Sequence, residues 1–278
     1  HTIEPRTLLG RRTPCVGRDK EIALLDATFR ECIEESVARA VLITAPAGFG
    51  KSRLQQELVG RVDKDATVLF ARADPMGIGS SLGLVRQLLQ GAAGIREGDP
   101  NAARHAALRQ YLSRFFTDDA LERQLELLGE LIGAPSPHPT PGMRAARDDA
   151  RILAAWLRRA FEEWMEAASD AGPMLVLLED LHWGDRGSVA FFEDALRKNA
   201  NRALMVVALA RPEVHELFPE LWSKVSVQEV RLPALTRRAA ERLVRALMPE
   251  ATETSVEHIV VRAEGNAFYL EELIRHVA

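Results

Sequence analysis

Short apolar runs alternate with amphipathic stretches along most of the chain. We expect β-strands where a run is continuous and bounded by turn-forming residues. Such runs begin at Val41 and occupy residues 66–73, 174–178 and 204–210, and an alternating run occupies 225–232. The runs at 174–178 and 204–210 are apolar throughout, which is typical of strands buried on both faces of a parallel sheet. The alternating run instead predicts an edge strand.

The amphipathic stretches predict helices because their apolar residues recur at helical spacing. The first helix has Asp19 as its expected N-cap. The expected helices span residues 19–33, 53–58, 82–89, 101–116, 121–132, 145–168, 237–248, 255–262 and 268–277. The alternation of strands and helices predicts a three-layer α/β domain with a central, mostly parallel sheet, followed by a small all-helical part.

Two features between residues 133 and 168 interrupt this regular pattern. Four prolines within 133–142 predict a hinge or surface loop, because proline removes a backbone donor and fixes φ. In the long helix that follows, Trp156, Phe161 and Trp164 lie on one apolar face. We interpret this aromatic stripe as core rather than as a cofactor-binding face.

A small-residue loop joins the strand at Val41 to the next helix and carries the clearest chemistry. It matches G-x-x-x-x-G-K-[ST] with Ala45 in place of the first glycine, and it retains Gly48, Gly50, Lys51 and Ser52. Glycines let backbone N–H groups close around phosphate oxygens, and the helix N-terminus adds a positive dipole end. Lys51 would reach the β- and γ-phosphates and Ser52 would bind Mg²⁺. The alternative is a glycine-rich turn with an exposed lysine.

Polar residues follow the two buried apolar runs, at Glu179, Asp180 and Arg211. Ligands of open parallel sheets lie outside the carboxyl ends of the strands, so we expect these residues to converge on the Lys51 loop. We assign Glu179 to the metal shell, directly or through water, and Asp180 to activation of the attacking water, although the division of roles stays open. Arg211 suits a γ-phosphate sensor. The alternatives are a strand cap paired with arginine and a surface arginine, and His182 is interpreted as an ordinary loop histidine.

Composition narrows the class of protein. The chain has 278 residues, 47% of them hydrophobic and 27% charged, which are ordinary globular values. A formal net charge of -4 gives no global basic field for nucleic acid or an anionic membrane. Cys15 and Cys32 form no metal-binding pattern, and no run of about 18 apolar residues could span a bilayer. We therefore expect a reduced, cytoplasmic setting without a membrane partner.

Several stretches together resemble the AAA-type ATPase domain of STAND signal-transduction NTPases, the module of large LuxR-type regulators and of ATPase-fused serine/threonine kinases. The phosphate loop marks only the superfamily, and the other stretches are more specific. They are Val16-Gly17-Arg18-x-x-Glu21, Leu177 to Asp185, Arg211-Pro212-Glu213 and Gly265 to Leu273. The resemblance implies a P-loop NTPase of the ASCE type and covers about Cys15 to the end of the chain.

The resemblance also implies a domain organisation and a set of contact residues. Residues 1–14 would be a linker, 15–232 the nucleotide-binding domain with a helical insertion at about 80–168, and 233–278 a helical lid whose C-terminus is truncated. The implied nucleotide contacts are Val16, Gly17, Arg18, Ala47, Gly48, Phe49, Gly50, Lys51, Ser52, Arg53, Pro233, Gly265 and Asn266. The family commonly has proline where Ala267 stands. We expect the natural protein to extend beyond both ends into fused sensor and effector domains.

The function we expect is a slow, Mg²⁺-dependent regulatory ATPase. ADP would hold a resting, closed domain, and exchange for ATP would move the lid and let copies of the domain associate into a homo-oligomer. One alternative is a nucleotide-binding interaction module without hydrolysis, which Ala45 and Glu179 make credible. Another is a DNA-handling AAA ATPase, which the net charge does not favour. A small-molecule phosphotransferase lacks an acceptor motif.

Overall fold

A computed structural model describes residues 7–8, 11–62, 66–75 and 81–277 of the chain. Asp74 to Gly79 is rich in breakers of regular structure and predicts a turn, but this turn falls largely outside these residues, as does most of the expected linker before residue 11. Residues 7–8 (β1) and 11–12 (β2) pair as antiparallel strands, Thr7 with Arg12 and Leu8 with Arg11. No helix in the described ranges is long and apolar enough to cross a membrane.

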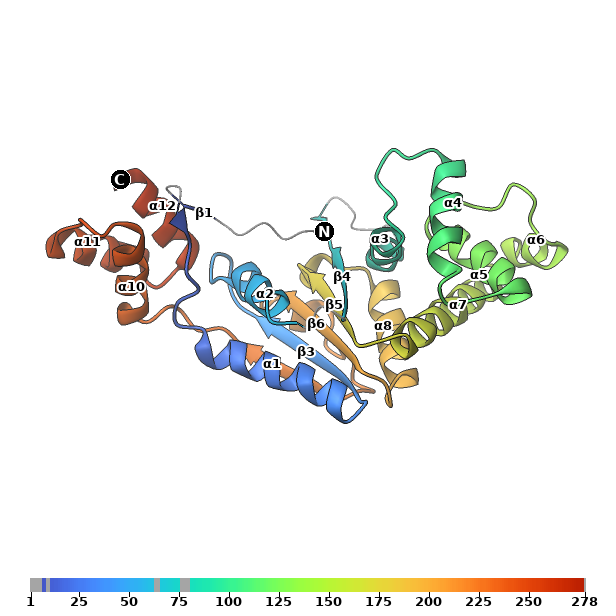
Figure 1. Ribbon diagram of the computed structural model, residues 1–278, viewed down its shortest axis with the longest axis horizontal. Helices are drawn as coiled ribbons and strands as arrows, with labels where there is room; N and C mark the ends of the chain where they lie inside the picture. The colour runs from blue at the N-terminus through green and yellow to red at the C-terminus, as the bar shows by residue number, and fades with distance from the viewer. Residues whose placement is uncertain (1–6, 9–10, 63–65, 76–80, 278) are drawn as a thin grey trace.

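The centre of the protein is a five-stranded parallel sheet in the order β4-β5-β6-β3-β7 (Figure 1). The strands are β3 (Ala38–Thr44), β4 (Thr67–Arg72), β5 (Met174–Glu179), β6 (Leu204–Ala210) and β7 (Val227–Arg231). β6 is buried at every position and lies between β3 and β5. The alternating strand β7 is at the edge, as its pattern predicts. The register places the ends of β3, β5 and β6 at one side of the sheet, where Thr44 pairs with Ala210.

Helices cover both faces of this sheet, so the predicted three-layer α/β fold is confirmed. Alternating side chains of β3 divide between the two faces: Val41 and Ile43 face one way, Ala40 and Leu42 the other. On the first face the strands pack against α1 (Asp19–Glu34) and α2 (Lys51–Val59). The second face is covered by α3 (Gly83–Ala92), α7 (Ala150–Asp170) and α8 (Arg186–Lys198).

The segment between β4 and β5 forms a helical extension at one end of the molecule (Figure 1). Besides α3 and α7 it holds α4 (Asn101–Leu112), α5 (Asp118–Leu131) and α6 (Pro141–Arg147). Phe161 and Trp164 are fully buried, which confirms part of the predicted aromatic core. Ile152 and Trp156 of the same helix, however, are 44% and 40% exposed, and Trp156 lines a cavity of the helical extension.

The structure corrects several predicted boundaries: the helix expected at 101–116 ends at Leu112, the one expected at 121–132 begins at Asp118, and the loop expected at 133–142 ends at Thr140. The starts of the long helix and of the first helix also differ. The single helix expected at 145–168 is broken, because the Asp149 carboxylate accepts from the N–H groups of Arg151 and Ile152 and starts α7 there. Residues 141–147 form a separate helix, with proline at its first position, where no donor is lost. Asp19 is the first helical residue rather than the N-cap, which is Arg18. Its carboxylate still favours the positive helix end.

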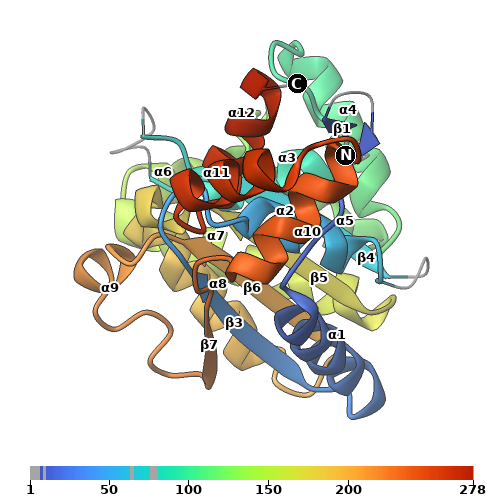
Figure 2. The same ribbon diagram turned by 90° about the vertical axis from the view of Figure 1, so that its left-hand side faces the viewer.

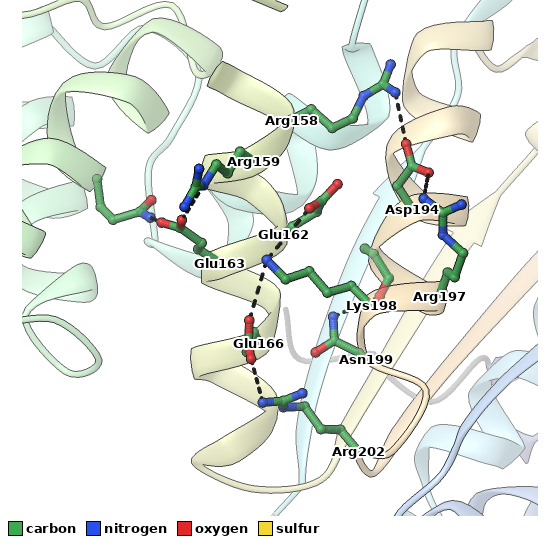
Figure 3. Close-up of polar contacts among 12 residues, drawn as sticks. Arg158, Arg159, Glu162, Glu163, Glu166, Asp194, Arg197, Lys198, Asn199 and Arg202 are labelled. Atoms are coloured by element: carbon green, nitrogen blue, oxygen red, sulfur yellow. Dashed lines mark hydrogen bonds and ion pairs between the residues drawn. The ribbon is translucent and has the colours of Figure 1, made fainter. Parts of the chain in front are cut away.

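A ladder of ion pairs ties α7 to α8 and to the loop that follows (Figure 3). Asp194 accepts from Arg158 at 2.9 Å and from Arg197 at 3.0 Å. Further along α7, Glu166 contacts Lys198 at 3.6 Å and Arg202 at 2.7 Å. The helical extension is therefore held to the central domain by charges as well as by the apolar core.

The last helices form a C-terminal helical unit with an apolar cluster of its own. It consists of α10 (Arg237–Leu247), α11 (Glu253–Ala263) and α12 (Ala267–Val277), within two residues of the predicted bounds. The threonines Thr236 and Thr252 cap the first two. In Figure 2 this unit faces the viewer, in front of the sheet. Two short elements, η2 (Leu181–Trp183) and α9 (Val214–Leu217), follow β5 and β6.

Candidate functional site

The loop between β3 and α2 has the backbone conformation that phosphate binding requires. Gly48 and Gly50 have φ of 82° and 89°, a region that side chains other than glycine rarely adopt. Ala45 is buried and its N–H bonds to the Ala210 carbonyl at 3.2 Å, so this position continues the sheet and is not among the positive-φ residues. The substitution of the first glycine is therefore compatible with the loop.

Lys51 begins α2 and turns back over this loop. Its Nζ donates to the carbonyls of Ala45 at 2.7 Å and Pro46 at 3.1 Å. Burial lowers the pKa of Lys51, the nearby Asp180 carboxylate raises it, and the Arg211 guanidinium lowers it. In the part of the chain that the structure describes, Lys51 has no carboxylate within 4.0 Å. The ammonium group therefore keeps an uncompensated positive charge for an anion.

The two acids after β5 lie at the expected sheet edge, but they differ in position. Asp180 has φ of 53° and lines the cavity beside Lys51, whereas Glu179 is not among the cavity-lining residues. Arg72, at the end of β4, donates to Asp180 at 2.9 Å and lies 3.9 Å from Glu179. Sequence reasoning missed Arg72, although the strand-end rule that singled out Asp180 applies equally to β4.

Arg211 follows β6 and faces both the cavity and an aromatic ring. Its guanidinium carbon is 5.2 Å from the centroid of the Trp183 ring, and its backbone N–H donates to His182 Nδ1 at 3.3 Å. His182 lies in the turn after β5 and is only 5% exposed, so it is a buried histidine of this loop. Asp185, four residues after Leu181, caps α8 through Ser188 and also accepts from the N–H of Gly83 in α3. The residues from His182 to Asp185 therefore connect the end of β5 to Arg211 after β6, to α8 and to α3.

Arg18 and the C-terminal helical unit close the other side of the loop. Arg18 is 3% exposed and donates to the carbonyls of Phe49 at 2.9 Å and Pro233 at 2.7 Å. Asn266 donates to the Ala47 carbonyl at 3.2 Å, and the Phe268 N–H donates to the Gly48 carbonyl at 2.9 Å. A Cβ at Gly48 would lie 2.4 Å from the Asn266 side-chain oxygen. The phosphate loop and the unit are thus in direct contact.

These elements enclose a cavity of about 270 Å³. Eleven of the residues expected at the site, counted within the described ranges, line it: Val16, Arg18, Ala47, Gly48, Phe49, Gly50, Lys51, Ser52, Arg53, Asp180 and Arg211. Gly17, Glu179, Pro233, Gly265 and Asn266 are not lining residues. Gly17 instead packs against Ala239, where a Cβ would be 2.7 Å away.

Sequence reasoning missed other lining residues, which are Thr13, Pro14, Cys15, Arg72, Leu235, Leu243, Ala267, Phe268 and Glu271. Thr13 and Pro14 belong to the stretch that we expected to be a linker. Leu235 and Leu243 belong to the apolar cluster of the C-terminal helical unit. Their helical periodicity alone could not show that they face a ligand.

The residues present fit a nucleotide with Mg²⁺. The hydroxyl of Thr13 and the Nε of Arg53 are buried without a partner within the described residues, and both residues line the cavity. Ser52 is exposed in the first turn of α2 and Asp180 lies across the cavity. No cluster of three or more metal-binding side chains occurs in the described ranges. A Mg²⁺ ion bound mainly by phosphates and water needs only one or two protein ligands.

A second cavity, of about 590 Å³, lies in the helical extension and contains none of the phosphate-loop residues. Although it is larger, its arginines are neutralised. Arg109 bonds Glu122 at 2.7 Å, and Arg123 and Arg159 each bond Glu163 at 2.9 Å. We therefore place the nucleotide in the smaller cavity, where basic side chains remain available.

Comparison with known proteins agrees with this geometry. The model of the AAA ATPase domain family matches residues 14–207. An uncharacterized protein of Rhizobium meliloti (strain 1021) is 28% identical over 205 residues, which are 72% of this chain and 19% of that protein. The chain therefore spans about a fifth of the length of that relative.

Solved structures of similar fold include the ORC1 protein of Aeropyrum pernix in complex with DNA (TM-score 0.56, 14% identity, 96% of this chain and 61% of that chain). The Drosophila ORC bound to DNA has a TM-score of 0.54 at 13% identity, covering 95% and 55%. A STAND protein with a tetratricopeptide repeat sensor from Pyrococcus horikoshii has a TM-score of 0.45 at 14% identity, covering 96% and 30%. The likeness to the two ORC structures, at 14% and 13% identity, shows the fold alone. With the family match over residues 14–207, the chain belongs to the AAA ATPase domain family.

Proposed function

We propose that this chain is a regulatory ATPase module that binds ATP and ADP with Mg²⁺ and reports which of them is bound through its C-terminal helices. One observation carries the proposal: carbonyls of the phosphate loop accept hydrogen bonds from Asn266 and Phe268, 2.9–3.2 Å away. A phosphate-dependent change in this loop would therefore reach α12 directly. The C-terminal helical unit is accordingly the lid.

Each site residue has a physical role in this proposal. The loop amides and Lys51 bind the phosphates. Ser52, together with Glu179 at the end of β5 acting directly or through water, would hold Mg²⁺, which would neutralise charge at the phosphates. Asp180 orients the attacking water and accepts its proton, while Arg72 keeps a hydrogen bond to the same carboxylate. Arg211 contacts the γ-phosphate, because a guanidinium can donate two hydrogen bonds to phosphate oxygens.

The proposal extends to the protein around the module. The STAND-like pattern and the small share of the Rhizobium relative that the chain spans support fused sensor and effector domains. Nucleotide-dependent association of copies and a cytoplasmic location belong to the same proposal. A direct contact with nucleic acid does not, since the DNA in the ORC structures belongs to those proteins and the net charge here is -4.

Phosphate release at steady state tests hydrolysis. We expect slow Mg²⁺-dependent release that disappears in Lys51→Ala and in Asp180→Ala. Arg109→Met, in the distant cavity of the helical extension, is the matched control and should keep the wild-type rate. Nucleotide binding without release from the wild type would favour the non-hydrolysing interaction module. That second function has support in the ion pair between Arg72 and Asp180, which engages the expected catalytic acid.

Small-angle scattering tests the switch. The full chain is measured with ADP and with a non-hydrolysable ATP analogue at saturating concentration. We expect a different shape or oligomeric state for the two nucleotides, because a ligand shifts a conformational equilibrium only by its differential affinity for the two states. Identical scattering curves and identical masses would contradict the switch while leaving nucleotide binding intact.

A further inference from the structure

One three-residue turn holds both the backbone and the side chain of Arg211. The turn is η2, which follows Asp180 directly. His182 accepts from the Arg211 backbone N–H, and Trp183 places its ring 5.2 Å from the Arg211 guanidinium carbon. The carboxyl end of β6 is thereby tied to the carboxyl end of β5 by side chains as well as by the sheet.

His182 anchors this turn, because its ring is buried and accepts a hydrogen bond from the Arg211 backbone. The Arg211 N–H donates to Nδ1, so Nδ1 carries no proton and Nε2 holds the ring proton. Burial lowers the pKa of His182. Nε2 has no partner in the described part of the chain. The His182 ring lies 4.5 Å from the Trp183 ring, centroid to centroid. A buried, neutral ring in this position fixes the neighbouring indole without adding charge near the phosphate site.

The partner of Arg211 differs in kind from those of the other arginines around the cavity. Arg72 and Arg53 bond the carboxylates of Asp180 and Glu57. Arg211 has no carboxylate within 4.0 Å among the described residues, and its contact is the face of an aromatic ring. A ring face restrains a guanidinium by cation–π attraction but leaves its charge and its N–H donors available. A carboxylate would occupy those donors.

Arg211 also lines two hollows at once. It belongs to the nucleotide cavity with Lys51, and with Trp183 it lines a hollow of about 350 Å³ that Leu217 and Phe218 complete. Trp183 lines this hollow and is not among the residues that line the nucleotide cavity, so Arg211 joins the indole to that cavity only as the residue common to both.

We propose that Trp183 is a positioning residue that holds Arg211 toward the γ-phosphate, and that this contact sets the preference of the site for ATP over ADP. The inference rests on the proposed function, because it assumes that Arg211 meets the γ-phosphate. An arginine side chain loses much rotamer freedom when it binds a ligand, and a preformed platform reduces that loss. ADP lacks the group that Arg211 would contact, so its binding does not depend on the platform.

Calorimetric titration of Trp183→Leu and Trp183→Phe in the full chain tests the platform. With Mg²⁺, we expect Trp183→Leu to weaken binding of a non-hydrolysable ATP analogue about threefold and to leave ADP binding unchanged. Trp183→Phe, which keeps an aromatic face, should retain most of the preference. Equal weakening of both nucleotides would contradict the proposal, because it would indicate a general loss of structure.

A double-mutant cycle with Arg211→Ala separates positioning from a merely structural role. In the Arg211→Ala background, Trp183→Leu should not change the ratio of the two affinities any further. A ratio that still falls would overturn the proposal. If the wild type binds neither nucleotide, the proposed function fails; if it binds both and Trp183→Leu changes nothing, only the present inference fails.

Fluorescence provides a readout that needs no destabilising variant. The emission of Trp183 is obtained as the difference between the wild type and Trp183→Phe, since Trp156, Trp164 and Trp222 also emit. We expect this difference to change when the ATP analogue binds and to stay constant when ADP binds. The same change with both nucleotides would contradict the proposal that the contact between Trp183 and Arg211 responds to the γ-phosphate.

Discussion

The nucleotide cavity at the carboxyl ends of the strands and the cavity of the helical extension differ in how their charges are compensated. Among the described residues, five basic and two acidic side chains line the nucleotide cavity, against three basic and four acidic ones in the helical extension. In the extension each lining arginine bonds a glutamate. Figure 3 shows the same pattern continuing between α7 and α8.

The difference shows that size alone does not identify a ligand site. The cavity in the extension has about 590 Å³ against about 270 Å³, yet its cations already have partners. In the nucleotide cavity, Lys51 bonds only backbone carbonyls and Arg211 faces a ring. The Arg211 guanidinium lowers the pKa of Lys51, and an anion bound between these two cations would relieve their repulsion. Ion pairing therefore distinguishes the two cavities: the lining arginines of the helical extension are paired with glutamates, whereas Lys51 and Arg211 in the nucleotide cavity are not paired with carboxylates.

Lys51→Ala should have the largest effect on binding. Removing a charge-assisted contact to the phosphates is expected to weaken ATP and ADP about 100-fold, since hydrogen bonds to charged groups contribute roughly 1.5–3 kcal/mol. Calorimetry measures the affinities, and circular dichroism checks the fold. A loss below about threefold would mean that this cation does not meet the phosphates.

Arg211→Ala should have the next largest effect, and a selective one. We expect the affinity for the ATP analogue to fall about tenfold while that for ADP changes less than about twofold, because only ATP has the phosphate that Arg211 contacts. The same titrations measure both. An equal loss for both nucleotides would place Arg211 elsewhere on the ligand.

Asp194→Ala should affect stability instead of binding. Asp194 is buried and bonds Arg158 and Arg197, so its removal leaves two partly exposed guanidinium groups without a carboxylate. We expect the free energy of unfolding in urea to fall by about 1–2 kcal/mol and nucleotide affinity to stay unchanged. A change in nucleotide affinity without a change in the free energy of unfolding would contradict the view that the ion pairs of Asp194 stabilise the fold and take no part in binding.

Arg109→Met should have the smallest effect. Arg109 and Glu122 form an exposed ion pair in the extension, and such pairs contribute about 0–1 kcal/mol. Urea unfolding should differ from the wild type by less than about 0.5 kcal/mol, and ATP binding should not change. Loss of nucleotide binding in this variant would mean that the larger cavity takes part in the function.

Acid should destabilise the protein through two of its histidines, the half-buried His105 and the buried His182. Burial lowers the pKa of both His105, in the extension, and His182, at the sheet edge, so the unfolded chain binds protons first as the pH falls. Stability is therefore expected to decrease as the pH falls below about 6.5, the pKa of unfolded histidine. His182→Gln should reduce this pH dependence in urea unfolding, and an unchanged dependence would contradict the assignment.

Much of the fold follows from patterns that are local in sequence. The apolar runs at 174–178 and 204–210 predict buried parallel strands, because burial on both faces leaves no polar position. The bounds of α7 were less predictable. The sequence from Ala145 to Ala150 is compatible with a continuous helix. The break occurs because the Asp149 side chain accepts hydrogen bonds from the backbone as an N-cap, which the sequence pattern does not reveal.

The candidate site was predictable where one strand end determines it and unpredictable where distant segments meet. Lys51, Asp180 and Arg211 follow from the strand-end rule, and all line one cavity. Arg72 was missed because an apolar pattern does not reveal which acid an arginine pairs with. The contact of Arg18 with Pro233 joins residues 215 apart in sequence, so only the fold shows that Arg18 links the phosphate loop to the segment before α10.

The most direct test of the central claim is a calorimetric titration of the folded 278-residue chain with ATP and with ADP in the presence of Mg²⁺. We predict one site for either nucleotide, competition between the two, and loss of the binding heat in Lys51→Ala. Folded wild-type protein that takes up neither nucleotide would contradict the claim that the uncompensated cations at this sheet edge bind phosphate.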